Sequence, residues 1–178
     1  MIRKAAGADL DAVAGIYDEL HRAEEAGLVT VGWKRDVYPV RSTAEAALKR
    51  GDLFVLEEDG AVLGSGIINQ IQPDAYGFAP WEHEAADNQV CVLHTLVISP
   101  GAGGAGRGRS FVRFYEAYAL EHGCRKLRID TNERNLTARA MYRRLGYKET
   151  AVVPTVFNGI PGVRLVLLEK WLDREAAE

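Results

Sequence analysis

The stretch from residue 90 to residue 109, VCVLHTLVISPGAGGAGRGR, has the residue types and spacing most suited to binding a charged ligand. An apolar run ends at Ser99-Pro100, five glycines follow within eight residues, and a helical pattern begins directly after them. N–H groups in the first turn of a helix have no partner inside the helix, and the helix dipole makes that end positive. Glycine has no Cβ, so an anion can approach the backbone closely. This order of strand, loop and helix predicts a phosphate-binding loop.

One known loop matches the glycines literally. Gly101, Gly103 and Gly106 spell the GxGxxG of dinucleotide-binding folds, and Asp130 ends the next predicted strand, about where such folds place a ribose-binding acid. However, a Ser-Pro pair separates the strand from the loop, a long segment precedes the loop, and little chain follows for a second nucleotide-binding half. An NAD-binding oxidoreductase is therefore a weaker alternative.

The residues from 103 to 110 also resemble a Walker A loop, GxxxxG, followed here by Arg109 and Ser110. The Walker lysine is a compact point charge that contacts nucleotide phosphates, and arginine is a poor substitute for it. No apolar strand that ends in Asp is convincing as a Walker B segment. A nucleotide-hydrolysing site is the least supported interpretation of the loop.

A third pattern, [Q/R]-x-x-G-x-[G/A] just after a strand that ends near a proline, fits better. In this feature the chain resembles the GNAT superfamily of acetyltransferases, which bind the pyrophosphate of acetyl-CoA at this loop. Gly106 and Gly108 take the required glycine positions, and Gly104 takes a common additional one. Gly103 stands where the superfamily has Gln or Arg, so one side-chain contact is missing while backbone contacts remain.

A second segment strengthens the resemblance. Asn135 precedes Tyr142 by seven residues, and Leu145-Gly146-Tyr147 follows, which is similar to the second signature of the superfamily. The two signatures stand in the expected order and cover residues 89–150. Neither the dinucleotide loop nor the Walker loop accounts for the second one.

The resemblance implies that acetyl-CoA is the acyl donor, without a metal ion, and that an acceptor amine attacks the thioester directly in a ternary complex. The backbone of Leu96, Val97 and Ile98 would pair with the pantetheine arm, as an added strand pairs with a sheet edge. Asn135 would contact the cofactor arm or orient the site, and it can also cap a helix. Contacts to the pyrophosphate are expected from the backbone N–H groups of Gly104, Ala105, Gly106, Arg107, Gly108 and Arg109.

Tyr142 aligns with the tyrosine that protonates the departing thiolate in this superfamily. A phenol with a pKa of about 10 can donate a proton to a developing thiolate. The helical pattern alone fits a core tyrosine beside Met141 and Leu145.

A general base is also needed, because most amines are protonated at neutral pH. His94 is the first candidate, since it lies on the predicted central strand near the expected thioester and histidine titrates near neutrality. A hydrogen-bonded histidine inside a sheet is the alternative for His94. The other candidates for the base are Glu82, His83, Glu84, Asp130 and a chain of water molecules.

Two further groups of residues bear on ligand binding. Trp33, Tyr38 and the pair Phe157-Asn158 occupy segments that border the acceptor site in this superfamily, although loop aromatics also serve simple packing. The helix after the glycines contains arginines and no acid before Glu116, which favours a bound anion over a free helix N-terminus. The arginines of this helix are Arg107, Arg109 and Arg113. Arginines that are simply solvated at the surface would show the same pattern.

The elements that must position these residues alternate along the chain in the order βααβββαβαββ. Helices are predicted over 9–25, 42–50 (with a Ser42–Glu45 capping box), the segment after the glycines, and 136–145. Strands are predicted over 2–5, 53–57, 62–71, 89–98, 126–130, 147–153 and 163–169, with a turn region over 154–162. This order is typical of an α/β (α+β) fold, and the resemblance implies a mostly antiparallel central sheet flanked by helices.

The bulk properties are those of a globular protein, and residues 1–178 are expected to form one domain. The 178 residues carry a net charge of -3, with 47% hydrophobic residues, so nothing indicates binding to nucleic acid or to a membrane. Cys91 and Cys124 have no metal-ligand spacing and are expected to be buried reduced thiols, which fits a cytoplasmic protein. The expected function is an N-acetyltransferase acting on a small-molecule or peptide amine. The sequence leaves open a homodimer and a non-catalytic acyl-CoA-binding or regulatory module.

Overall fold

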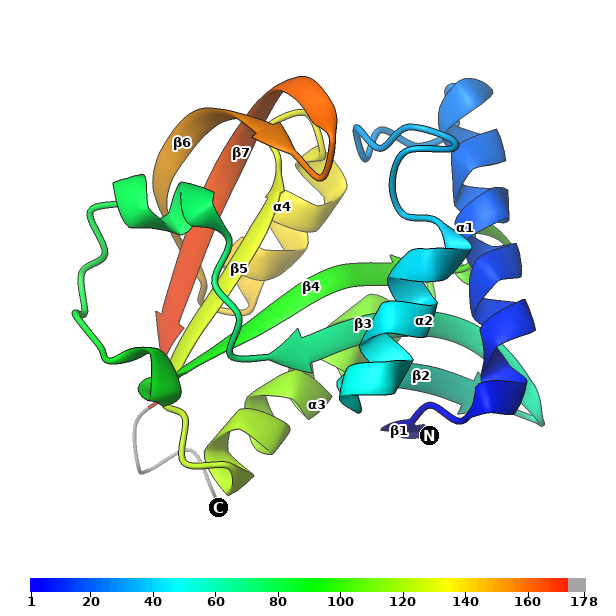
Figure 1. The fold of residues 1–178 in the computed structure, drawn as a ribbon, viewed down its shortest axis with the longest axis horizontal. Coiled ribbons are helices and arrows are strands. Elements are labelled where there is room, and N and C mark those ends of the chain that lie inside the picture. Colours follow the sequence, from blue (N-terminus) through cyan, green and yellow to red (C-terminus); the bar gives the residue numbers. More distant parts are fainter. Residues whose placement is uncertain (173–178) are drawn as a thin grey trace.

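A computed structural model describes residues 1–172, and a mixed sheet of seven strands runs through its centre (Figure 1). The strands lie in the order β1-β2-β3-β4-β5-β7-β6, and the predicted mostly antiparallel sheet and chain order are confirmed. The strands are β1 (Ile2–Lys4), β2 (Leu53–Glu58), β3 (Ala61–Asn69), β4 (Val90–Ile98), β5 (Lys126–Asn132), β6 (Lys148–Phe157) and β7 (Ile160–Trp171). The helices are α1 (Leu10–Glu25), α2 (Arg41–Arg50), α3 (Arg107–Glu121) and α4 (Leu136–Arg144), with a 3-10 turn η2 (Asp74–Phe78) in the long loop before β4.

Helices cover both faces of the sheet, because alternate residues along a strand point to opposite sides. Leu53 and Val55 of β2 pack in the cluster that contains α1 and α2. Phe54 and Leu56, the residues between and after them, pack in the cluster that contains α3 and α4. The continuous apolar run in β2 is therefore explained by burial on both faces.

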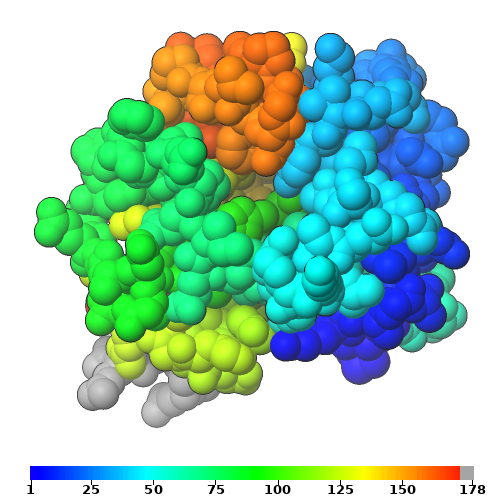
Figure 2. All heavy atoms as spheres, viewed as in Figure 1, coloured from blue at the N-terminus to red at the C-terminus, as the bar shows by residue number. Residues whose placement is uncertain are grey.

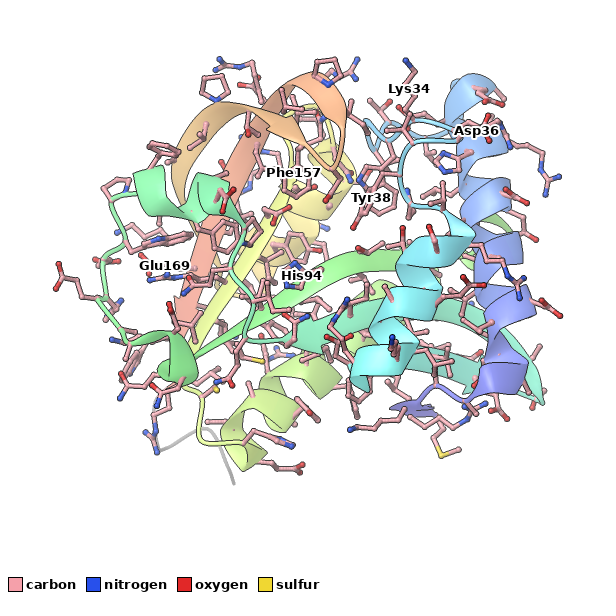
Figure 3. All side chains as sticks on the ribbon, in the orientation of Figure 1. Lys34, Asp36, Tyr38, His94, Phe157 and Glu169 are labelled. Carbon is pink, nitrogen blue, oxygen red and sulfur yellow. The ribbon has the colours of Figure 1, made fainter. Side chains whose placement is uncertain are left out.

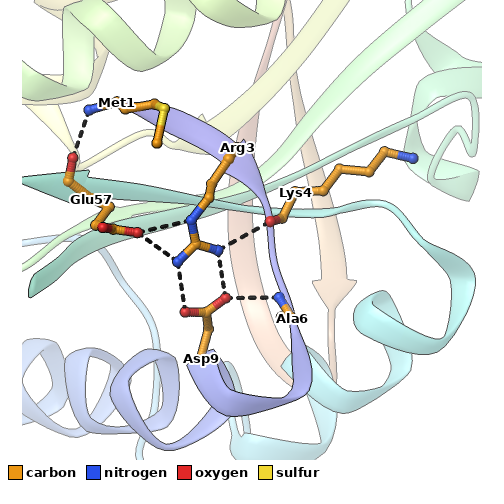
Figure 4. Close-up of polar contacts among 6 residues, drawn as sticks. All are labelled: Met1, Arg3, Lys4, Ala6, Asp9 and Glu57. Carbon is orange, nitrogen blue, oxygen red and sulfur yellow. Dashed lines mark hydrogen bonds and ion pairs between the residues drawn. The ribbon is translucent and has the colours of Figure 1, made fainter. Parts of the chain in front are cut away.

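One arginine ties the first strand to the neighbouring elements. Arg3 of β1 donates to Asp9 Oδ2 at 2.7 Å and to Glu57 Oε2 at 2.6 Å (Figure 4). Asp9 also accepts from the N–H of Ala6 at 2.7 Å, and the hydrogen bond from Arg3 lowers the pKa of the Asp9 carboxyl. Asp9 stands at the N-cap of α1, but its side chain makes no cap hydrogen bond to that helix.

Two local predictions are wrong. The N-cap of α2 is Val40, whose N–H donates to the Thr43 hydroxyl at 3.1 Å, so the predicted 42–45 box does not form. The connection between β6 and β7 is much shorter than the predicted 154–162 region. Asn158 and Gly159 both have positive φ angles, 49° and 80°, which suits a tight two-residue hairpin turn.

The two cysteines, Cys91 and Cys124, are free and buried, as expected. No helix within residues 1–172 has the length and apolar character needed to span a bilayer.

The sheet opens between β4 and β5, which Figure 1 shows as two strands diverging from a shared end. Their parallel pairing runs from Val90 opposite Lys126 to Leu93 opposite Ile129. Beyond that point β4 continues to pair with β3 on its other side, and β5 continues to pair with β7 through Asn132. A dinucleotide-binding fold needs a largely parallel sheet, so this single parallel pair argues against the GxGxxG interpretation.

A β-bulge bends β4 just after the separation. Ser65 of β3 pairs with Val97, and Ile67 pairs with His94, so three steps along β4 oppose two along β3. Thr95 lies within the bulge with a φ of 49°, which is rare for a β-branched residue. Its hydroxyl contacts the hydroxyl of Tyr38. Bulges of this kind often lie beside functional sites, where they redirect side chains.

Gly66 of β3 tests how tightly α3 packs on the sheet. A Cβ at this position would lie 2.7 Å from Phe111 Cε1, so Gly66→Ala should lower the free energy of unfolding by about 1–3 kcal/mol. Gly15→Ala in α1 is the matched control, because nothing lies within 4 Å of its added Cβ and alanine favours the helix by about 1 kcal/mol. Chemical denaturation measures both. Equal stabilities for the two variants would contradict the packing described here.

Candidate active site

A cavity of about 1280 Å³ opens where β4 and β5 separate. Figure 2 shows the surface hollowed between the N-terminal region (blue and cyan) and the β6–β7 hairpin (orange). The walls come from β4, the glycine loop, α3, α4, the end of β5, the 28–40 loop and the β6–β7 hairpin. The residues predicted for cofactor contacts and acceptor binding line this one cavity, together with Tyr142, His94 and Asp130.

The second half of β4 presents an unpaired strand edge to the cavity. Leu96, Val97 and Ile98 follow the bulge and line the cavity, and the β4–β5 pairing has already ended at Leu93. Backbone N–H and C=O groups that lack a strand partner must be satisfied by water or by a ligand. An extended amide-containing chain can fill that place as an added strand does.

Two glycines of the loop have backbone conformations that favour glycine. Gly104 and Gly106 have φ angles of 83° and 76°, which side chains with a Cβ rarely adopt. Gly106 is the N-cap of α3, so the N–H groups at the start of α3 have no partner within the helix. A Cβ on Gly108 would lie 3.2 Å from Met141 Sδ, which shows how closely α3 and α4 approach at this end of the cavity.

The arginines at the start of α3 are only partly available to a ligand. The Arg107 guanidinium donates to Glu58 Oε2 at 2.6 Å and to the Ala102 carbonyl at 2.8 Å. Arg113 lies 3.1 Å from Glu116. Within residues 1–172, Arg109 makes no ion pair, and it lines the cavity. Of the three arginines that favoured a bound anion, Arg109 is therefore the one left without an ion pair among the described residues, beside the backbone N–H groups of the helix start.

Asn135 caps α4. Its Oδ1 accepts from the N–H of Ala138 at 3.1 Å, while the residue also lines the cavity. The two interpretations from the sequence, helix cap and site residue, are compatible in this geometry.

Tyr142 lies on the face of α4 that closes the cavity. Its ring is almost wholly buried and meets Tyr147 edge to face, with centroids 5.9 Å apart. Its hydroxyl has no hydrogen-bond partner among residues 1–172. Burial, together with the nearby Asp130 carboxylate, raises the pKa of the phenol. Tyr142 therefore stays protonated at neutral pH and can serve as a proton donor at the cavity wall.

His94 does not titrate near neutrality, so that expectation is wrong. Burial lowers the pKa of its imidazole to about 4. Nε2 lies 2.9 Å from Asn69 Oδ1, which also accepts from the N–H of Ile71 at 2.9 Å, while Asn69 Nδ2 donates to Asp52. These partners fix the orientation of the Asn69 amide, so Nε2 of His94 must carry the proton. His94 is a neutral group that is hydrogen-bonded inside the sheet.

Asp130 is better placed to take a proton. His94 and Asp130 are the first residues beyond the last β4–β5 pair, so they flank the opening from the two strands. Burial raises the pKa of the Asp130 carboxyl to about 7, against the opposing effect of a hydrogen bond from the Tyr76 hydroxyl. Among the residues that line the cavity within 1–172, Asp130 is the one carboxylate.

The other proposed bases lie elsewhere. Glu82 pairs with Lys148 at 2.9 Å, and the His83 ring stacks on Trp171 with centroids 5.3 Å apart. Neither of these residues nor Glu84 lines the cavity. They are therefore not positioned to act on a substrate bound there.

Aromatic side chains from the 28–40 loop and the β6–β7 hairpin also line the cavity. Trp33 and Tyr38 meet edge to face with centroids 5.8 Å apart. Phe157 and Asn158 approach from the β6–β7 hairpin. In Figure 3 the side chains of Tyr38, His94 and Phe157 lie around the same central opening.

Sequence reasoning missed Tyr76 and Asn69, the partners of Asp130 and His94. Tyr76 lies in the long aromatic loop that precedes β4, and the length of that loop was the one sequence signal for a functional role. Nothing in the sequence pattern near Asn69 singled it out.

Comparisons with known proteins agree with this geometry. The model of the acetyltransferase (GNAT) family matches residues 13–147. A GNAT-family acetyltransferase from Streptococcus agalactiae is 25% identical, with a TM-score of 0.80 over 98% of this chain and 96% of that one. No match was found among curated proteins.

Two further solved structures share the fold. A putative acetyltransferase from Salmonella typhimurium, solved with its cofactor acetyl-CoA, is 21% identical, with a TM-score of 0.71 over 100% of this chain and 96% of that one. A ribosomal-protein-alanine N-acetyltransferase from Brucella melitensis is 21% identical, with a TM-score of 0.72 over 97% and 99% of the two chains. Since the family model spans most of the sequence, the chain belongs to the acetyltransferase (GNAT) family.

Proposed function

We propose that this protein transfers an acetyl group from acetyl-CoA to a primary amine by direct attack in a ternary complex. The observation that carries this proposal is the position of Asp130 and Tyr142 in one cavity with an open strand edge and a helix N-terminus. The acetyl-CoA bound in the Salmonella structure, which has the same fold, supports the choice of donor. A thioester supplies an activated acyl group.

The donor end of the cavity would be held mainly by the backbone. The free edge at Leu96–Ile98 would pair with the amides of the pantetheine arm. The N–H groups at the start of α3 and the unpaired Arg109 would neutralise the pyrophosphate. This arrangement leaves the other end of the cavity for the amine.

We assign the role of general base to Asp130 in place of His94. An amine that enters as an ammonium must lose a proton before its lone pair can attack. A carboxylate whose pKa is about 7 is partly ionised at neutral pH and can accept that proton. His94, with a pKa of about 4, is too weak a base for an ammonium and remains a neutral wall of the site.

Tyr142 would donate its hydroxyl proton to the thiolate that leaves. Its raised pKa keeps the proton on the phenol until a stronger base appears beside it. Attack forms the C–N bond, and collapse of the tetrahedral intermediate breaks the C–S bond. The nitrogen loses two protons in all: Asp130 takes the first before attack and later releases it to solvent, and the second leaves the nitrogen on collapse and replaces the proton that Tyr142 gave to the thiolate.

Donor binding is tested by thermal unfolding. Acetyl-CoA at about 100 times its Kd should raise Tm by about 5 °C or more, because a ligand that binds only the folded state stabilises it. NAD at the same concentration should leave Tm unchanged. A shift with NAD and none with acetyl-CoA would contradict the proposal.

Asp130→Asn tests the base. With a panel of primary amines, thiol release from acetyl-CoA should fall about 10²–10⁴-fold in this variant. In the unmodified protein, kcat/KM should rise with pH to a plateau above about 7, because the carboxyl must be ionised. His94→Gln is the control, and it should leave this acid limb in place.

An acid limb near pH 4 that disappears in His94→Gln would show that His94 is the base. Binding of acetyl-CoA without acetylation of any amine in the panel would instead favour the non-catalytic module.

A further inference from the structure

Tyr76 makes the one side-chain hydrogen bond to Asp130 among residues 1–172. It belongs to η2 in the loop between β3 and β4, far from Asp130 in sequence, and it is only 2% exposed. Its hydroxyl donates to Asp130 Oδ2 at 2.8 Å. This contact joins the long loop to the end of β5, where the sheet opens.

The Tyr76 ring is itself held from several sides. It meets Trp81 edge to face with centroids 5.3 Å apart, and Trp81 Nε1 donates to the Tyr76 carbonyl at 2.9 Å. Trp81 in turn lies over the Arg128 guanidinium, 4.0 Å from the ring centroid. Tyr76 also packs in an apolar cluster that contains Leu165 and Leu167 of β7. A hydroxyl carried on such a ring has little freedom to leave its partner.

The two oxygens of Asp130 are therefore in different situations. Oδ2 is occupied by the Tyr76 hydroxyl. Oδ1 has no hydrogen-bond partner within the described residues and is not among the buried polar atoms that lack one, so it remains accessible. Since Asp130 lines the cavity, Oδ1 is the oxygen that a bound ligand can reach.

We propose that Tyr76 is a positioning residue, which holds the Asp130 carboxylate by Oδ2 so that Oδ1 faces the acceptor amine. This inference rests on the proposed function, in which Asp130 is the general base. It assigns a role in the reaction to the loop between β3 and β4, which otherwise has none.

The same hydrogen bond affects the ionisation of Asp130. Burial raises the pKa of the carboxyl, and the Tyr76 hydroxyl opposes that effect because it stabilises the carboxylate. The other groups around Asp130 hold their charge across the neutral range. Tyr38 and Tyr142 have raised pKa values and stay neutral, His94 stays neutral, and Arg128 on the same strand stays positive.

Tyr76→Phe removes the hydroxyl and keeps the ring. The acid limb of kcat/KM should move from about pH 7 to higher pH by about one unit, because the carboxylate loses a stabilising donor. Tyr115→Phe is the matched control. It removes another buried tyrosine hydroxyl, which donates to the Cys91 carbonyl at 2.6 Å and does not line the cavity. This variant should unfold at lower denaturant concentration and keep the acid limb in place.

A titration that needs no activity separates this inference from the proposed function. The carboxyl 13C resonance of Asp130, assigned by its loss in Asp130→Asn, should titrate near pH 7 and shift upward by the same amount in Tyr76→Phe. If the resonance shifts and the rate profile does not, Tyr76 holds Asp130 but Asp130 is not the base. If neither the resonance nor the rate profile shifts in Tyr76→Phe, the role of Tyr76 is wrong.

Discussion

The parallel pairing of β4 with β5 stops at Leu93 and Ile129, and the features of the candidate site depend on that separation. It leaves the backbone of the second half of β4 without a strand partner on one side. It also places the next residues of the two strands, His94 and Asp130, in the wall of the cavity. A bulge at Thr95 sharpens the divergence, and this residue holds an uncommon backbone conformation next to Tyr38. Residues with strained backbone conformations cluster at active sites and ligand-binding sites.

Within this opening, burial decides which groups can exchange protons. Burial disfavours the charged form of three of them, so it raises the pKa of Asp130 and of Tyr142 and lowers that of His94. The result is a carboxyl group that is partly ionised near pH 7 beside a phenol that keeps its proton. A base and an acid with separated pKa values are what a transfer from an ammonium to a thiolate requires.

Much of the fold could be predicted from the sequence, and the residues expected at the donor end do line one cavity. The glycine pattern, the Asn135–Tyr142 spacing and the hydrophobic periodicity are local signals, and they matched the start of α3 after the loop, the cap of α4 and the order of the elements. The general base could not be predicted, because the pKa of a side chain depends on burial and on partners brought from distant segments. Arg107 shows the same limit, since it pairs with Glu58, which lies 49 residues earlier in the chain.

A crystal structure of the protein with acetyl-CoA tests the proposed donor site most directly. We expect the pantetheine amides to hydrogen-bond to the backbone of Leu96–Ile98 and the pyrophosphate to lie against the first N–H groups of α3. We also expect the sulfur to lie within hydrogen-bond reach of the Tyr142 hydroxyl. A cofactor bound outside the opening between β4 and β5, or a sulfur beyond the reach of Tyr142, would contradict this donor site.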